Sequence, residues 1–183
     1  MIKVYDNIVS EDLQEAIKTS LFDNTTNWNY LSDITKYPGK DQQRVGFLHE
    51  MVFNGEVLSP LTFHSFSIVN NALVRSKKEL DKIINIRSFL QLPLNIDTSE
   101  VDTPHIDMHS PHLAMVYYVV DSDGDTIIYN ETEESDTYTV QKKVTPKQGR
   151  VVVFDGKFYH TAEQPTKSKR CIMNFDVGIL NDN

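Results

Sequence analysis

Five short runs of strand-forming residues divide the second half of the chain, and their spacing constrains the fold more than any other feature. The runs cover residues 113–120, 126–129, 138–143, 150–155 and 170–179. Turn-forming segments separate them. Five such runs within about 80 residues are typical of a β-sandwich or β-barrel, and alternating β-α units would need longer connections.

The first half of the chain shows helical patterns after a strand-like run at residues 2–5. Ser10 is a candidate N-cap, and apolar residues recur at helical spacing behind it, which predicts a helix over residues 11–22. Pro60 suits the first turn of a second helix over residues 60–80. Two helices followed by a strand-rich half indicate an α+β fold.

Composition narrows the class of protein. A length of 183 residues with 39% hydrophobic residues predicts one globular domain over residues 1–183. The single cysteine, Cys171, excludes an internal disulfide and a zinc site made of several thiolates. A net charge of −8 argues against a nucleic-acid partner.

We expect a cytoplasmic protein without a membrane anchor. The first residues lack the charged and apolar regions of a signal peptide. The sequence also contains no run near the roughly 18 apolar residues that a membrane-spanning helix needs.

The segment Thr103-Pro-His-Ile-Asp-Met-His-Ser-Pro-His112 is rich in side chains that bind metal ions. On an extended chain, residues two apart project to the same face, so His105 and Asp107 can hold one ion. A stable site needs a third ligand. His160, in the downstream segment Phe158-Tyr-His-Thr161, can supply it.

Two histidines and one carboxylate in this order predict a facial triad. Such a triad holds Fe(II) on one octahedral face and leaves open positions for oxygen chemistry. A 2-oxoacid can chelate the metal through its ketone and its C1 carboxylate. Arg170 begins the last strand-forming run, where its guanidinium can bind the distal carboxylate of a dicarboxylic 2-oxoacid through two hydrogen bonds.

The chain resembles the Fe(II)- and 2-oxoglutarate-dependent dioxygenases, and within them the prolyl 4-hydroxylase-like branch. The matching motifs are Val4-Tyr5-Asp6-Asn7, His105-Ile-Asp107, Tyr117-Tyr118, Gly124-Asp-Thr126, Pro146-Lys-Gln-Gly-Arg-Val-Val-Val-Phe154, His160 and Arg170. Many prolyl hydroxylases carry Lys in place of Arg170, so the resemblance supports the cosubstrate more strongly than a prolyl substrate.

The resemblance implies a double-stranded β-helix (jelly-roll) core with the N-terminal helices packed on one sheet. It implies His105, Asp107 and His160 as ligands of Fe(II), and Arg170 as the residue that binds 2-oxoglutarate. Tyr118 matches a tyrosine that hydrogen-bonds the cosubstrate in several relatives. Asn174 shares a strand face with Arg170 by period-two counting and is expected to line the same pocket. Ascorbate is an expected supporting reductant.

The predicted function is hydroxylation of an unactivated C–H bond, coupled to oxidative decarboxylation of 2-oxoglutarate with dioxygen. A peptidyl proline, an amino acid or another small molecule is the expected substrate. The alternative is a non-catalytic β-helix binding domain whose site is vestigial or holds zinc, since zinc accepts the same ligands in tetrahedral geometry.

Two histidines and two segments of the sequence each allow more than one interpretation. His109 and His112 are expected on the substrate side or at the surface, because as extra ligands they would close the site. The segment Asp121-Ser-Asp-Gly-Asp125 imitates a calcium loop but lacks its later Gly and Glu, so a turn between strands is expected. The segment 28–53 is a candidate substrate lid, although aromatic loops often only cover a core. Its notable residues are Trp28, Tyr30, Tyr37, Arg44 and Phe47.

Overall fold

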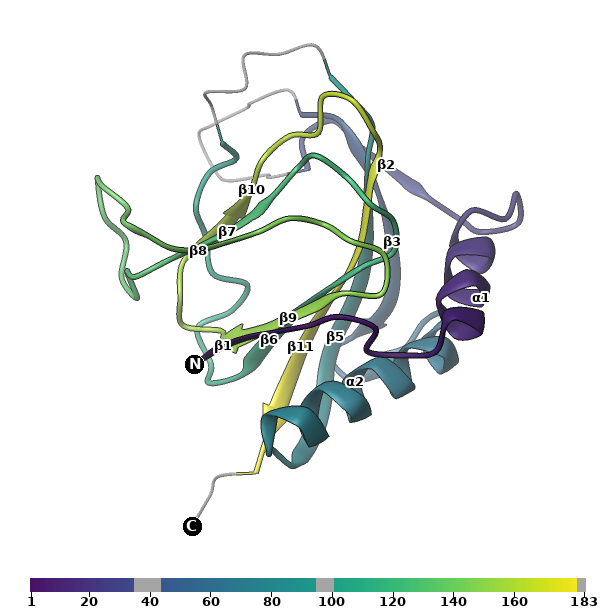
Figure 1. Cartoon of the computed structure of the whole chain (residues 1–183), viewed down its shortest axis with the longest axis horizontal. Coiled ribbons are helices and arrows are strands. Elements are labelled where there is room, and N and C mark those ends of the chain that lie inside the picture. The colour runs from purple at the N-terminus through teal and green to yellow at the C-terminus, as the bar shows by residue number, and fades with distance from the viewer. Residues whose placement is uncertain (35–43, 95–100, 181–183) are drawn as a thin grey trace.

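The computed structural model describes residues 1–34, 44–94 and 101–180, which form mostly antiparallel sheet with two helices (Figure 1). The elements in chain order are β1 (Ile2–Tyr5), α1 (Glu11–Leu21), β2 (Asn29–Leu31), β3 (Gly46–Phe53), β4 (Glu56–Val57), α2 (Thr62–Ser76), β5 (Leu80–Gln91), β6 (Leu113–Tyr118), β7 (Thr126–Tyr129), β8 (Val140–Val144), β9 (Val151–Asp155), β10 (His160–Ala162) and β11 (Arg170–Ile179).

The strands form two sheets. The larger sheet has eight strands in the order β1-β9-β6-β11-β5-β3-β2, with β4 paired to β3. The smaller sheet has the order β10-β7-β8. Every strand pair among the described residues is antiparallel. The strand-rich architecture without alternating β-α units, which the strand spacing predicts, is therefore present.

Side-chain alternation along β6 divides the core into two clusters. Tyr117 belongs to a cluster that also contains Ile17 from α1 and Ile68 from α2. Tyr118 faces the opposite way, into a second cluster with Phe154 and with residues of the smaller sheet. One face of the large sheet therefore shares its apolar core with the helices, while the other faces the smaller sheet.

Both helices begin near the predicted residues, but the second is shorter than expected. The Ser10 hydroxyl accepts a hydrogen bond from the backbone N–H of Leu13 at 3.4 Å, which confirms the predicted N-cap of α1. The helix α2 ends at Ser76 because Lys77 adopts a left-handed conformation with φ 56°. Strand β5 begins at Leu80, so the helix predicted over residues 60–80 is four residues too long at its C-terminal end.

The segment 28–53 contributes strands as well as connecting residues. Strand β3 pairs with the central strand β5 along most of its length, so its aromatic residues belong to the large sheet. Trp28 packs against the core and donates its indole N–H to the carbonyl of Leu21 at 3.0 Å. The core-covering interpretation therefore holds for Trp28. Tyr37 and the expected Pro38-Gly39 turn lie outside the described residues.

The expected turn at Asp121-Ser-Asp-Gly-Asp125 joins β6 to β7, and its central carboxylate organises a neighbouring loop. Asp123 accepts hydrogen bonds from the backbone N–H groups of Thr166, Lys167 and Ser168 at 3.0, 3.0 and 3.1 Å. This loop leads directly into β11. Neither helix in the described part of the chain has the length and apolar character needed to cross a bilayer.

Candidate metal centre

The two histidines of the predicted triad lie side by side because their backbones pair. The N–H of His105 donates to the carbonyl of His160 at 3.0 Å, and the N–H of His160 donates to the carbonyl of His105 at 2.9 Å. Their ring centroids are 4.7 Å apart. A short bridge outside the long strands thus brings residues from distant parts of the sequence to one point.

A carbonyl oxygen orients each imidazole. Nδ1 of His105 lies 3.1 Å from the carbonyl of Thr103, and Nδ1 of His160 lies 3.2 Å from the carbonyl of Phe158. A carbonyl oxygen only accepts, so each Nδ1 carries the proton of its hydrogen bond. In the neutral ring this leaves Nε2 as the metal-binding nitrogen, an arrangement common for histidine ligands.

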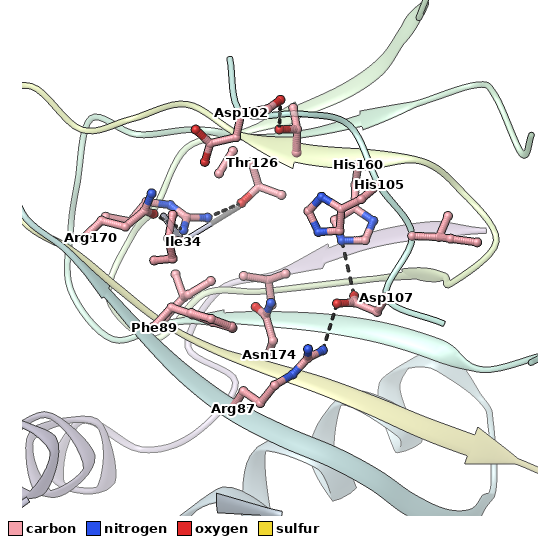
Figure 2. Close-up of a pocket in the computed structure, with 16 residues that line it drawn as sticks. Ile34, Arg87, Phe89, Asp102, His105, Asp107, Thr126, His160, Arg170 and Asn174 are labelled. Carbon is pink, nitrogen blue, oxygen red and sulfur yellow. Dashed lines mark hydrogen bonds and ion pairs between the residues drawn. The ribbon is translucent and has the colours of Figure 1, made fainter. Parts of the chain in front are cut away.

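Asp107 completes a group that could hold a metal ion. Its Oδ2 lies 3.3 Å from Nε2 of His160. One ligand atom from each of His105, Asp107 and His160 lies within 4.8 Å of the others. Figure 2 shows the two imidazoles above the carboxylate, with Arg87 on the far side of Asp107. The structure therefore brings together the three residues that the sequence predicts as ligands.

The protonation states of the group follow from burial and from mutual contact. Burial and the neighbouring His160 lower the pKa of His105 to about 4. Burial alone would raise the pKa of Asp107, but hydrogen bonding to His160 and nearby positive charge outweigh it and lower that pKa. Burial opposes the charged form of His160, yet contact with Asp107 raises its pKa. At neutral pH the carboxylate is therefore ionised, as a metal ligand must be.

Arg170 is buried, with 3% of its surface exposed, and neutral acceptors hold its guanidinium. Its nitrogens donate to the carbonyl of Gly124 at 3.0 Å, to Oε1 of Gln91 at 2.9 Å and to Oγ1 of Thr126 at 2.9 Å. A side chain at Gly124 would crowd this contact, because a Cβ there would lie 3.1 Å from Cδ of Arg170 and 2.6 Å from the carbonyl of Glu163. Within the described residues no carboxylate forms an ion pair with Arg170, so this buried charge suits an anionic ligand.

A single cavity of about 290 Å³ joins the triad to Arg170. Figure 2 shows Arg170 on one side of this space and the two histidines on the other. The lining of the cavity is partly polar and partly apolar, and its apolar residues include Phe89, Val116 and Ile172. The volume of the cavity is near the lower end of the range for small-molecule pockets, which is roughly 300–1,000 Å³.

Asn174 and Tyr118, the two further residues expected to contact 2-oxoglutarate, lie at different depths. Asn174 lines the cavity, and its Oδ1 is buried without a hydrogen-bond partner among the described residues. Tyr118 is fully buried beside Arg170 but does not line the cavity. Burial raises the pKa of Tyr118 to about 12, so its hydroxyl remains protonated and can donate. This hydroxyl donates a long hydrogen bond to the carbonyl of Val144, at 3.5 Å.

The expectation for His112 is wrong, whereas His109 is exposed as expected. His112 has 6% of its surface exposed, packs against Gly156 and does not line the cavity, although one of its ring nitrogens lies within 4.8 Å of carboxylate oxygens of Asp107 and Asp176. Its Nδ1 lies 2.8 Å from the carbonyl of Ser110, and its Nε2 lies 3.8 Å from Oδ1 of Asp176. The neighbouring strands enclose the ring, a long-range effect that the polar local sequence did not reveal.

Sequence reasoning missed Arg87, which contacts the predicted carboxylate ligand. Arg87 lies on β5 and donates to Oδ1 of Asp107 at 2.8 Å and to Oδ2 of Asp176 at 2.9 Å. Gln91 and Thr126, which hold Arg170, were missed as well. The available signal was an arginine inside a strand-like run of mostly apolar residues, where a charge requires a partner.

No family model and no curated protein matches the sequence. Solved structures do match. A prolyl-4-hydroxylase from Pseudomonas putida superposes with a TM-score of 0.64 at 12% identity, over 98% of this chain and 93% of that chain. The chain has the fold of the 2-oxoglutarate- and iron(II)-dependent oxygenases.

Two further solved structures with this fold also match the chain. The 2-oxoglutarate-dependent carbocyclase SnoK, from nogalamycin biosynthesis, matches with a TM-score of 0.68 at 13% identity, over 96% of this chain and 78% of that chain. HygX from Streptomyces hygroscopicus, solved with nickel and 2-oxoglutarate bound, matches with a TM-score of 0.61 at 13% identity, over 97% and 82%. The family resemblance in the sequence motifs is thus confirmed at the level of the fold.

Proposed function

We propose that the protein is an Fe(II)- and 2-oxoglutarate-dependent oxygenase that hydroxylates an unactivated C–H bond. One observation carries this proposal: a single cavity contains both a His-Asp-His group and a buried arginine, Arg170, without a carboxylate partner among the described residues. A simple metal-binding protein needs only the first of these features. A 2-oxoglutarate enzyme needs both.

The donor set fits Fe(II). His105 and His160 each present Nε2, and Asp107 presents Oδ2, from one side of the cavity. Two nitrogens and one oxygen on one face of an octahedron leave the other positions open, whereas a closed structural zinc site takes four protein ligands. With the iron bound, the centre would supply the activation of dioxygen, and the cavity walls would exclude water from it.

The cavity also fits a dicarboxylate. Three of the five N–H groups of Arg170 are used by Gly124, Gln91 and Thr126, which fixes the plane of the guanidinium. Its remaining N–H groups can donate to the distal carboxylate of 2-oxoglutarate. Asn174 lies between Arg170 and Asp107 and can hydrogen-bond the bound cosubstrate through its amide.

For the primary substrate we propose a peptidyl proline, an amino acid or a comparable small molecule. The structural similarity to a prolyl-4-hydroxylase supports the peptide. The structure of HygX with hygromycin B bound shows that this fold also accepts a polar small molecule, which supports the wider class.

The test is anaerobic reconstitution with Fe(II), followed by addition of 2-oxoglutarate and dioxygen. We expect one iron per chain, a metal-to-ligand absorption band that depends on 2-oxoglutarate, and formation of succinate. Peptides and amino acids would then be screened for a mass gain of one oxygen. Iron binding without the absorption band and without succinate would contradict the proposal. Tight zinc binding without either signal would favour the non-catalytic alternative.

A further inference from the structure

The two carboxylate oxygens of Asp107 contact different residues. Its Oδ2 faces His160 at 3.3 Å, and its Oδ1 accepts a hydrogen bond from Nη2 of Arg87 at 2.8 Å. The same nitrogen of Arg87 donates to Oδ2 of Asp176 at 2.9 Å. One oxygen of Asp107 is therefore directed at the proposed metal position and the other away from it.

Arg87 is itself fixed by the large sheet. It lies on β5 directly opposite Asn174 of β11, and Asp176 belongs to the same strand. Asn85 donates a second hydrogen bond to Oδ2 of Asp176 at 3.0 Å. Asp176 has only 1% of its surface exposed, and burial together with the neighbouring Asp107 raises the pKa of its carboxyl group, so its ionised form depends on Arg87 as a counter-ion. The pair of Arg87 and Asp176 is thus a rigid part of the sheet.

Asp107, in contrast, lies on a segment with little regular structure. Between residues 101 and 112 no described residue lies in a strand: the backbone forms isolated bridges at Val101 and His105, and the carbonyl of His112 accepts a hydrogen bond from the N–H of Gly156 at 3.0 Å. Regular strand pairing therefore does not restrict rotation of the Asp107 carboxylate, and the restriction comes from its side-chain contacts with His160 and Arg87. The contact with Arg87 supplies the part of this restriction that comes from the large sheet.

We propose that Arg87 is a positioning residue that makes Asp107 a one-oxygen ligand of the metal. A carboxylate can bind a metal through one oxygen or both. Binding through both would occupy one more of the coordination positions that 2-oxoglutarate and dioxygen need. The hydrogen bond from Arg87 keeps Oδ1 engaged and leaves Oδ2 alone to ligate. This inference rests on the proposed function, because it concerns the same metal.

The experiment counts the water molecules on bound Mn²⁺, which needs no turnover. Three protein donor atoms on an octahedral ion leave about three water positions, and a second oxygen from Asp107 would leave about two. Water-proton relaxation of the Mn²⁺ complex measures this number. We expect about three waters in the wild-type protein and about two in Arg87→Gln. Arg87→Lys, which retains a donor and the charge, should give a value close to wild type.

Two further variants make the result specific. Arg150→Gln removes another arginine–aspartate pair, with Asp6 at the surface, and should leave the water count unchanged. If loss of Arg87 alone prevents folding, the double variant Arg87→Gln/Asp176→Asn removes both members of the buried pair while still freeing Asp107. Its expected count is also about two waters.

The outcomes separate this inference from the proposed function. A wild-type protein that binds Mn²⁺ and 2-oxoglutarate, with the same water count in Arg87→Gln or in the double variant, would overturn the inference and leave the function standing. A wild-type protein that takes up no divalent metal would overturn both. A water count that falls in Arg87→Gln and is restored in Arg87→Lys would support the positioning role.

Discussion

His105 and His160 are directly opposed across a two-residue bridge, and each backbone donates to the carbonyl of the other at 3.0 and 2.9 Å. This relationship fixes the separation of the two imidazoles by backbone hydrogen bonding instead of side-chain packing. It also explains how one histidine before β6 and one in β10 can serve a single ion. Asp107 then follows His105 by two residues, and its carboxylate lies within 4.8 Å of the ligand nitrogens of both histidines.

We predict that His105→Ala, Asp107→Ala and His160→Ala each abolish succinate formation. Each removes one of only three protein ligands, so iron affinity should fall by more than the about 10- to 100-fold typical of losing a partner of a ligand. Iron per chain and succinate would be measured after desalting, with circular dichroism to verify the fold. His109→Ala is the matched control, because His109 is exposed, and should retain both signals. Full iron content with turnover in any of the three would refute the ligand assignment.

We predict that Arg170→Leu weakens 2-oxoglutarate binding by at least about tenfold. Each charge-assisted hydrogen bond to the distal carboxylate contributes roughly 1.5–3 kcal/mol, and 1.4 kcal/mol corresponds to a factor of ten. Anaerobic titration of the Fe(II) protein, followed by its absorption band, gives the affinity. Arg170→Lys should lose less, since it keeps the charge without the planar fork.

Pyruvate is the control ligand for this titration, because it lacks the distal carboxylate. It should bind weakly to the wild type and to Arg170→Leu alike. Equal 2-oxoglutarate affinities in the two proteins would rule out this role of Arg170.

We predict that Gly156→Ala lowers the free energy of unfolding by about 1–3 kcal/mol, the usual cost of overpacking. A Cβ at this position would lie 2.1 Å from Nε2 of His112, which is itself buried. Urea unfolding measures the effect. Gly178→Ala is the matched control, since its Cβ would meet Lys82 and Asp81 side chains at 3.2 and 3.3 Å, and these can move. Equal losses in both variants would argue against the enclosed position of His112.

We predict that Asp123→Asn destabilises the protein at neutral pH and has a smaller effect in acid. Burial alone would raise the pKa of Asp123, but hydrogen bonds from Thr166 and Ser168 outweigh it and lower the pKa. A lowered folded-state pKa contributes its full stability above the unfolded value of about 3.9, and this contribution decreases progressively as the pH falls from that value through the folded-state pKa. Urea unfolding of both proteins at pH 7 and pH 3 would measure the difference. A difference that is the same at both pH values would contradict this role of the carboxylate.

Local signals in the sequence determined much of the fold. The N-cap at Ser10 and the helical spacing behind it predicted α1 within one residue of its observed end at Leu21. Strands β7 and β11 have the predicted bounds. These elements could be predicted because caps, turns and side-chain periodicity act over a few residues. The short strand β10 was not predicted, since three residues carry too little periodicity.

The sequence by itself also determined the candidate site as a set of residues. The set contains three metal-binding side chains and one guanidinium, at His105, Asp107, His160 and Arg170. Their order along the chain indicated a site for one metal ion and one dicarboxylate. Only the tertiary structure decided what surrounds them. His112 became a buried residue, and Arg87 became the partner of Asp107 through contacts between segments far apart in sequence. Such contacts depend on strand register and sheet order, which long-range packing sets and local sequence does not.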